Sequence, residues 1–338
     1  MNDRIDFSCF NNSNVLITGA TGLVGSHLVK KLLQGSTAKV FALSRSADSL
    51  AAQYDEYIDD RLYIIKQNVC EKIVINEDVD YIFHGAGPIS GDVIRNYPVD
   101  VISANIKGLA NCCDIAKKQI SNSGAGPRII VFSSVTVYGD PTDDEVVVRE
   151  DDILNNIDIQ SVNACYSESK RMSEVMINSM IRQYGLDAVI CRFSYIYGEV
   201  RNKPNIAIYQ FIDSLKNENE IVMNNSGLPK RDYIYIDDVI SALCVIAKDG
   251  RTGETYNVCS AGDKDNYVSI DEIADKMVSV TNKHNGANAR LTYRNNAGNA
   301  KSLNGIRVDN SKLKSLGWSI KNNLEDGITK MLQYYNVI

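Results

Sequence analysis

Short apolar segments alternate with amphipathic helical patterns through the first 198 residues of the chain. A strand that is apolar on both sides needs cover on both faces of its sheet, and the helices between parallel strands provide that cover. We therefore predict an α/β fold built on a doubly wound parallel sheet. The segments that we interpret as its strands are "NVLITG", "KVFAL", "LYIIK", "VDYIFHGAG", "RIIVFSS" and "DAVICRFSYIYG".

The pattern changes after Gly198, where loops rich in Asn, Lys, Gly and Pro separate shorter helical segments near 205–217, 237–248 and 269–281. We predict two lobes, 1–198 and 199–338, with some exchange of segments between them. The polar segment 282–305, rich in Gly and Asn, is expected to be a long surface excursion.

Charge and residue usage exclude some classes of function. The net charge of -6 argues against a surface that binds nucleic-acid phosphates. No stretch of the sequence is apolar over a membrane-spanning length, and residues 1–12 contain no apolar run of signal-peptide length, so we expect a cytoplasmic protein without a membrane partner. The eight cysteines lack zinc-type spacing and the three histidines are scattered, so we expect free thiols and no metal site.

A glycine-rich turn follows the first strand, in "NVLITGATGLVGSHLVKKLL". Gly19, Gly22 and Gly25 lie where the strand passes into a helix. Glycine permits close approach of the backbone, and the N–H groups at the start of the helix can bind a pyrophosphate. This placement predicts a Rossmann-type dinucleotide-binding domain in residues 1–198.

The end of the second strand, "KVFALSRS", bears on the choice of nicotinamide cofactor. NAD sites usually have an acidic residue there, whereas an arginine can pair with the 2′-phosphate of NADP. This chain has Ser44 followed by Arg45. We therefore expect NADP(H) to be favoured, with NAD(H) as the alternative.

A tyrosine and a lysine four residues apart, Tyr166 and Lys170 in "CYSESKR", share one face of a predicted helix. An ammonium group near a phenol favours ionisation of the phenol, and so lowers its pKa. The fifth strand ends in Ser133 and Ser134, at the edge where parallel sheets bind ligands. We predict Ser134, Tyr166 and Lys170 as the catalytic residues.

Taken in order, these motifs resemble the extended short-chain dehydrogenase/reductase family, in particular its nucleotide-sugar epimerases, dehydratases, decarboxylases and ketoreductases. The resemblance begins near residue 13 and continues to the C-terminus. It implies that residues 199–338 mainly bind a nucleotide sugar. The motifs that carry it are "TGATGLVGSHL", "HGAG", "NIKG", "SSVTVYGD", "CYSESKR", "CRFSYIYG", "KRDYIYIDDV" and "DNSKLKSLGWSI".

The resemblance also implies roles for individual residues. Tyr166 would exchange a proton with the sugar, Lys170 would bind the nicotinamide ribose and lower the phenol's pKa, and Ser134 would bond the reacting oxygen. The implied substrate-binding set is Ser134, Thr136, Tyr195 and Arg231, of which Arg231 would pair with the diphosphate. The implied cofactor-binding set is Gly19, Thr21, Gly22, Leu23, Val24, Gly25, Arg45, Asn68, Val69, Gly85, Ala86, Gly87, Asn105, Tyr166, Lys170 and Phe193.

Departures from the family pattern reduce the number of reactions that we expect this chain to catalyse. Similar 4,6-dehydratases have Asp-Glu directly after the strand-five hydroxyl, and UDP-glucuronate decarboxylases have a Glu two residues after it. This chain has Val135 and Thr136 there, which disfavours dehydration and puts decarboxylation in doubt. Tyr195 stands where many relatives have an Asn that contacts the substrate, so we expect an altered sugar pocket.

We therefore expect an enzyme that reduces the C4 keto group of a nucleotide-linked sugar, with Tyr166 as the proton donor. The alternative is a nucleotide-sugar 4-epimerase with retained NAD, and decarboxylase-like or dehydratase activity is less favoured. A non-catalytic cofactor sensor is disfavoured because Ser134, Tyr166 and Lys170 are all present. The family resemblance also implies a homodimer. The nucleotide, the sugar and the stereochemical outcome stay open.

Overall fold

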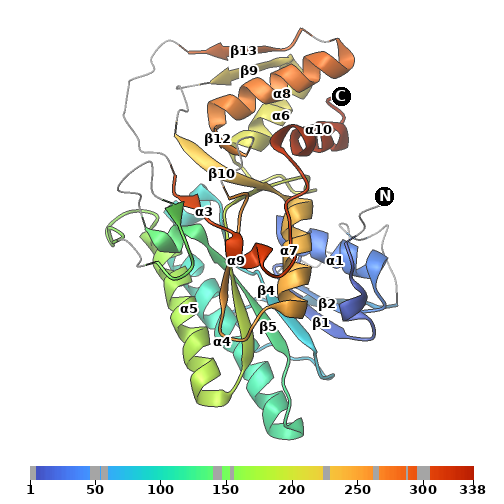
Figure 1. Cartoon of the computed structure of the whole chain (residues 1–338), viewed down its shortest axis with the longest axis vertical. Coiled ribbons are helices and arrows are strands. Elements are labelled where there is room, and N and C mark those ends of the chain that lie inside the picture. The colour runs from blue at the N-terminus through green and yellow to red at the C-terminus, as the bar shows by residue number, and fades with distance from the viewer. Residues whose placement is uncertain are drawn as a thin grey trace.

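The chain forms a large lobe with a smaller lobe above it (Figure 1). No helix in the described parts of this chain is both long and apolar enough to cross a membrane. The computed structural model describes residues 5–45, 54, 60–139, 147–152, 156–223, 229–261, 266–286, 288–294 and 305–338.

The large lobe is built on a seven-stranded sheet in which every pair of neighbouring strands is parallel. The predicted α/β fold with a doubly wound parallel sheet is confirmed. In spatial order the strands are β11 (Thr255–Val258), β7 (Asp187–Phe193), β5 (Arg128–Ser134), β4 (Tyr81–His84), β1 (Asn14–Thr18), β2 (Lys39–Ser44) and β3 (Leu62–Lys66).

Helices cover both faces of this sheet, as the apolar strands require. Successive side chains of a strand point to opposite faces, so Val15 packs in one apolar cluster and Leu16 in another. The first cluster includes residues of α1 (Leu23–Gly35) and α7 (Ile236–Asp249). The second includes residues of α4 (Pro98–Ser123) and α5 (Ala164–Tyr184), which lie side by side (Figure 1).

One predicted strand is wrong in its extent. The segment "DAVICRFSYIYG" forms two strands, β7 in the large sheet and β8 (Tyr195–Tyr197) in the small lobe. The backbone N–H of Ser194 still bonds to the carbonyl oxygen of Val258 in β11, whereas Tyr195 is paired with Tyr233. The strand divides because consecutive residues have partners in different sheets.

The smaller lobe contains a three-stranded sheet, in the order β12 (Tyr267–Ser269), β10 (Lys230–Tyr235) and β8. Its helices are α6 (Ala207–Glu218), α8 (Ile270–Asn285) and α10 (Leu324–Tyr334). Within the predicted surface excursion, β13 (Arg290–Tyr293) pairs with β9 (Glu220–Met223), while residues 287 and 295–304 lie outside the described residues. The remaining elements are η1 (Ser8–Phe10), α3 (Gly91–Asn96), η3 (Val135–Tyr138), β6 (Val147–Val148), β14 (Arg307–Val308) and α9 (Ser311–Lys314).

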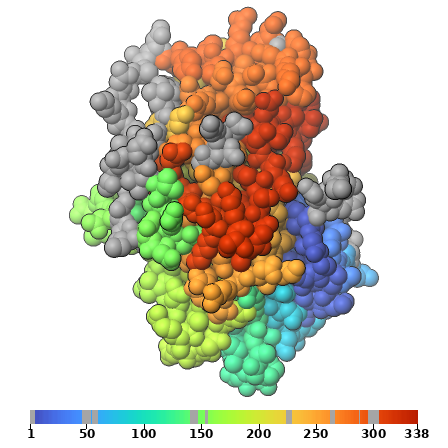
Figure 2. Space-filling view, viewed as in Figure 1, coloured from blue at the N-terminus to red at the C-terminus, as the bar shows by residue number. Residues whose placement is uncertain are grey.

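Segments of the second half of the chain return to the large lobe. α7 packs against α1, and β11 adds an edge strand to the large sheet. The C-terminal segment then runs from α9, which contacts β11, to α10 beside α8 (Figure 2). The division near residue 198 stays a prediction.

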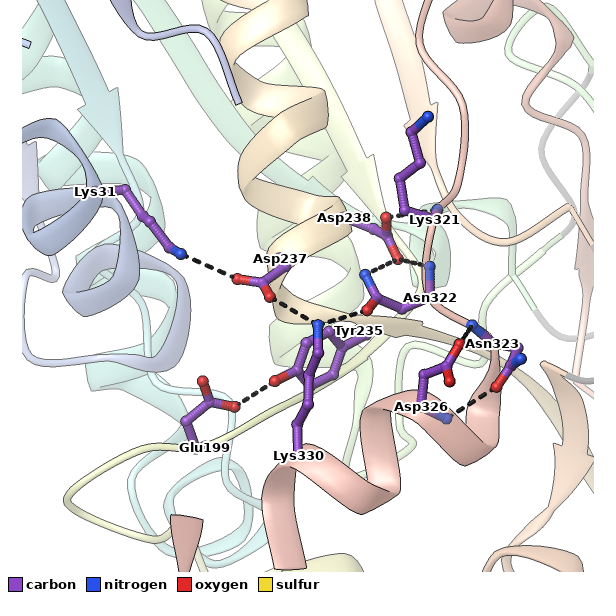
Figure 3. Close-up of polar contacts among 10 residues, drawn as sticks. All are labelled: Lys31, Glu199, Tyr235, Asp237, Asp238, Lys321, Asn322, Asn323, Asp326 and Lys330. Carbon is purple, nitrogen blue, oxygen red and sulfur yellow. Dashed lines mark hydrogen bonds and ion pairs between the residues drawn. The ribbon is translucent and has the colours of Figure 1, made fainter. Parts of the chain in front are cut away.

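The connection between α7 and the C-terminal segment depends on Asp238 (Figure 3). Its buried carboxylate accepts hydrogen bonds from the backbone N–H groups of Lys321 at 2.8 Å and Asn322 at 3.0 Å. The side-chain amide of Asn322 donates a third bond at 3.0 Å. These bonds fix the chain just before α10 begins.

The neighbouring residue, Asp237, makes ion pairs instead (Figure 3). Its carboxylate lies 3.5 Å from the ammonium of Lys31 in α1 and 3.2 Å from that of Lys330 in α10. All three side chains are partly exposed to solvent, so water weakens these pairs.

We expect Asp238→Ala to lower the free energy of unfolding by about 2 to 4 kcal/mol, because it leaves buried N–H groups without acceptors. Asp237→Ala is the matched control, and it should cost less than about 1 kcal/mol. Urea denaturation of both variants measures the difference. Equal losses would contradict the assignment of Asp238 as the stronger structural contact.

Candidate active site

The glycine turn after β1 is shaped by close backbone contacts. Gly19 has a φ of +73°, and a Cβ there would lie 2.7 Å from the carbonyl oxygen of Gly85. A Cβ at Gly25 would lie 2.3 Å from the carbonyl oxygen of Gly19. Both positions therefore need glycine, because an added carbon would push the turn away from β4 and α1.

The start of α1 is open to an anionic group. Gly22 is the N-cap residue, and it has no side chain that could cap the helix. The first N–H groups of a helix have no partner within the helix, and together they favour a negative charge. A pyrophosphate fits this end of α1. The predicted residues that carry these N–H groups are Leu23, Val24 and Gly25.

The end of β2 lies beside the glycine turn. The Thr21 hydroxyl is 3.1 Å from the hydroxyl of Ser44, so the two segments are hydrogen-bonded. The next residue, Arg45, is exposed. The residue that we predicted to select the cofactor therefore follows directly after a residue bonded to the glycine turn.

The turn after β3 lies close to Arg45. Asn68 is exposed, and its side-chain oxygen accepts a bond from the N–H of Cys70 at 3.1 Å. Burial raises the pKa of the Cys70 thiol, and the positive charge of Arg45 acts against this rise. Val69 is buried against Gly108 of α4. The structure thus brings the ends of β2 and β3 together at one end of the predicted cofactor site.

The turn after β4 is held by Thr18, the last residue of β1. The Thr18 hydroxyl accepts bonds from the N–H groups of Gly85 and Ala86, both at 3.2 Å. On its other side it lies 3.0 Å from Nδ1 of the buried His84. The Gly85–Gly87 loop, which belongs to the predicted cofactor-binding set, is therefore fixed to the end of β1, directly before the glycine turn.

Asn105 of α4 connects this loop to the catalytic helix. Its amide nitrogen donates to the Ser169 hydroxyl at 2.8 Å, while its oxygen is buried without a partner among the described residues. A Cβ at Gly87 would lie 2.7 Å from that oxygen and 3.7 Å from Nζ of Lys170. An unpaired buried acceptor beside a lysine fits a bound polar ligand such as a ribose hydroxyl.

Ser134 at the end of β5 is oriented by Thr136. The Ser134 oxygen accepts bonds from both the backbone N–H of Thr136, at 3.2 Å, and its hydroxyl, at 3.1 Å. Because a hydroxyl oxygen has two lone pairs, the Ser134 proton is left to point elsewhere. A side-chain hydrogen bond with Ser134 acts to lower the pKa of the Tyr166 phenol, so the two hydroxyl groups are neighbours.

The pKa of Tyr166 differs from the prediction. Burial around the phenol raises its pKa, and the bond from Ser134 offsets only part of the rise. We expected Lys170 to lower this pKa, but its ammonium donates to the carbonyl oxygen of Phe132 at 2.7 Å and lies 5.8 Å from the centre of the Tyr166 ring. Burial therefore determines the direction in which the pKa moves, and the phenol stays protonated at neutral pH.

The predicted sugar-binding residues lie beside this group. Tyr195 of β8 contacts the ring of Tyr233 at 5.7 Å, and the Arg231 guanidinium lies 5.8 Å from the Tyr195 ring. Tyr195 also interacts electrostatically with Tyr166. Phe193, at the end of β7, packs edge-to-face on Phe132. The small lobe thus presents Tyr195 between the predicted proton donor and the predicted diphosphate partner.

Two important residues were not predicted from the sequence. Thr18 is the first, although its position before the glycine turn is a usable signal. Glu174 is the second, and it lies buried one turn after Lys170 in α5. Its spacing from Lys170 could have revealed it. Among the described residues, no cluster of three His, Cys, Asp or Glu side chains could hold a metal ion.

Residues 15–259 match the model of the NAD dependent epimerase/dehydratase family. The chain belongs to this family. That membership confirms the resemblance to enzymes that act on nucleotide sugars, and a nicotinamide cofactor fits both the family and the glycine turn. It does not by itself identify the reaction, because the family includes several.

Relatives in this family catalyse different reactions. UDP-glucuronic acid decarboxylase 5 of Arabidopsis thaliana is 27% identical over 276 residues, which cover 81% of this chain and 76% of that protein. The dTDP-glucose 4,6-dehydratase 1 of Escherichia coli (strain K12) is 24% identical over 336 residues, which cover 95% and 92% of the two chains.

Solved structures of the family share the fold. A UDP-glucose 4-epimerase from Thermotoga maritima, solved with UDP-glucose, has a TM-score of 0.79 at 21% identity, covering 96% of this chain and 98% of its own. A UDP-glucuronic acid 4-epimerase from Bacillus cereus, solved with UDP-glucuronic acid and NAD, has a TM-score of 0.75 at 22% identity, covering 96% and 99%.

Proposed function

We propose that this member of the epimerase/dehydratase family reduces the C4 keto group of a nucleotide-linked sugar, with Tyr166 as the proton donor. The observation that carries the proposal is the contact between Thr136 and Ser134. By resemblance, the 4,6-dehydratases have Asp-Glu at positions 135 and 136 and the decarboxylases have a glutamate at position 136, whereas here a threonine hydroxyl at position 136 bonds Ser134 at 3.1 Å. The aliphatic hydroxyl of a threonine cannot replace the carboxylate acid or base that elimination of water needs at neutral pH.

When bound, the reduced nicotinamide supplies a hydride to the keto carbon. As that C–H bond forms, the carbonyl electron pair moves onto oxygen, which takes the proton of Tyr166. The hydroxyl proton of Ser134 stabilises the negative charge that develops there. With its raised pKa, Tyr166 is protonated at neutral pH, as a proton donor must be before the reaction.

Tyr166→Phe should lower kcat by about 100- to 10,000-fold, because it removes the proton donor. The Kd for the cofactor should change much less than kcat, because the glycine turn proposed to bind the pyrophosphate keeps its sequence. Tyr184→Phe is the matched control, because Tyr184 is exposed at the far end of the same helix. The assay follows nicotinamide absorbance and product NMR with a panel of nucleotide sugars and 4-keto intermediates. Full turnover by Tyr166→Phe would refute the catalytic assignment.

The runner-up is a 4-epimerase, which would use the same serine, tyrosine and lysine. Such an enzyme oxidises and re-reduces its substrate, so it must keep its NAD through each turnover. Ser134 and Thr136 are compatible with this reaction, because neither step needs a carboxylate at position 136. Nicotinamide that copurifies with the protein, together with sugar interconversion without added cofactor, would favour the epimerase over the reductase.

We propose that NADPH is the preferred reductant. The exposed Arg45 follows Ser44, which bonds the glycine turn, and this position suits a 2′-phosphate. Solved relatives such as the Bacillus cereus epimerase hold NAD, so the proposal rests on this arginine. A cofactor that is released after each turnover also suits a reductase better than an epimerase.

Arg45→Gln should raise the KM for NADPH by about tenfold or more, because it removes a charge-assisted hydrogen bond. The KM for NADH should change little. Arg182→Gln, in the exposed last turn of α5, is a control for the loss of one positive charge. Steady-state kinetics with both cofactors measures the effect, and a wild-type preference for NADH would overturn the proposal.

We also propose that the protein is a homodimer that pairs through α4 and α5. These neighbouring helices expose several large apolar side chains, and a cluster of this kind is typical of an interaction surface. A two-fold axis would place each of these helices against its copy. The exposed residues are Val99, Ile102, Met172 and Val175.

The dimer predicts a particle of about twice the 37.4 kDa of one chain in light scattering. Val175→Glu should shift the particle to the monomer, because it places a charge within the apolar contact. Val74→Glu changes an exposed valine outside both helices and serves as the control. A wild-type monomer would contradict the proposal.

A further inference from the structure

A buried carboxylate lies beneath the proposed active site. Glu174 of α5 is 7% exposed and forms a two-point ion pair with Arg192 of β7. Arg192 Nε donates to one oxygen at 3.0 Å, and Nη2 donates to the other at 2.8 Å. The proposed reaction includes no step for either residue.

The same carboxylate is bonded to the strand that carries the reactive serine. The hydroxyl of Ser133 donates to Glu174 at 2.5 Å, and Ser133 directly precedes Ser134. Lys170, one turn earlier in α5, donates to the carbonyl oxygen of Phe132. Two consecutive residues at the end of β5 are therefore bonded to two consecutive turns of α5.

Arg192 extends these contacts to the next strand. Its backbone is in register with Ser133, so Glu174 joins α5 to both β5 and β7 at the same level. The guanidinium also donates to the carbonyl oxygen of Glu150 at 3.0 Å and lies 4.8 Å from the Tyr138 ring. Arg192 is thus held from several sides.

Stability alone does not explain a pair of this kind. Removing two charges from water is costly, and a well-packed apolar pair at the same place is often as stable or more stable. The charged pair instead fixes the position of the end of β5 relative to α5, and it places a negative charge near Lys170. Both properties bear on the proposed chemistry.

Glu174 is the negative group that faces Lys170. Burial lowers the pKa of Lys170 to about 8, and the charge of Glu174 acts to raise it. His84 of β4 is also close, but burial lowers its pKa to about 3, so it is neutral. Tyr166 is protonated, and Arg192 is paired with Glu174 itself.

We propose, on the basis of the function proposed above, that Glu174 is a positioning residue of the active site. It holds the Ser134 end of β5 against the helix face that carries Tyr166 and Lys170, and it provides the buried negative charge that Lys170 faces. Arg192 acts through Glu174 by fixing its carboxylate.

Glu174→Gln keeps the shape of the side chain and removes its charge. The titration midpoint of Lys170 should then fall by about one pH unit, because the attractive charge is lost and the unpaired Arg192 repels the ammonium. NMR of ¹³C-labelled lysine measures this midpoint without a substrate, and the signal is assigned by its absence in Lys170→Arg. Glu168→Gln, at a partly exposed position of the same helix where the carboxylate pairs with Arg171, should leave the midpoint unchanged.

Turnover provides the second readout. The proposed reaction uses the protonated form of Lys170. In Glu174→Gln, the alkaline limb of the plot of kcat against pH should therefore move to lower pH, by the same shift as the NMR midpoint. The KM for the sugar should change little. Glu174→Asp keeps the charge but shortens the reach, so it should keep the Lys170 midpoint and lower kcat. Together the two variants separate charge from geometry.

If Glu174→Gln does not fold, the double variant Glu174→Leu/Arg192→Met removes the pair without leaving an unpaired charge. Its Lys170 midpoint should also be lower than that of the wild type. An unchanged midpoint in a folded variant would overturn the proposal. Absence of sugar turnover in the wild type would overturn the proposed function instead, because the NMR midpoint does not depend on turnover.

Discussion

The parallel pairing of the seven strands in the large sheet sets the position of every other functional part. Because neighbouring strands run in the same direction, their carboxyl ends gather at one edge. The glycine turn follows β1, the Gly85–Gly87 turn follows β4, and Ser134 ends β5. An antiparallel arrangement would send alternate strand ends to the opposite edge, and these residues would not meet.

Hydrogen bonds at this edge of the sheet then orient the side chains of the proposed active site. Thr18 accepts from the turn after β4, which keeps two loops in contact around the space for a dinucleotide. Thr136 uses both acceptor positions of the Ser134 oxygen, so that Ser134 acts as a donor. A donor beside a protonated phenol suits protonation of a developing oxyanion, which is what reduction of a ketone requires.

Much of the fold could be predicted because its signals are local. The apolar runs of β1, β2 and β5 predict strands by themselves, and the amphipathic patterns between the strands predict the helices that cover the sheet. The division of "DAVICRFSYIYG" into β7 and β8 could not be predicted in this way. Both halves are apolar and favour strands, and only their partners, β11 and β10, separate them.

For the site, the sequence by itself determined which residue types are present, their order along the chain and the family. It could do so because motifs such as the glycine turn and the Tyr166–Lys170 spacing lie within short segments of the chain. Only the tertiary structure decided the electrostatics. The pKa of Tyr166 is raised and not lowered because burial, which depends on tertiary packing, outweighs the hydrogen bond with Ser134. The link between Glu174, Ser133 and Arg192 likewise joins three separate elements, so no local pattern could show that they meet.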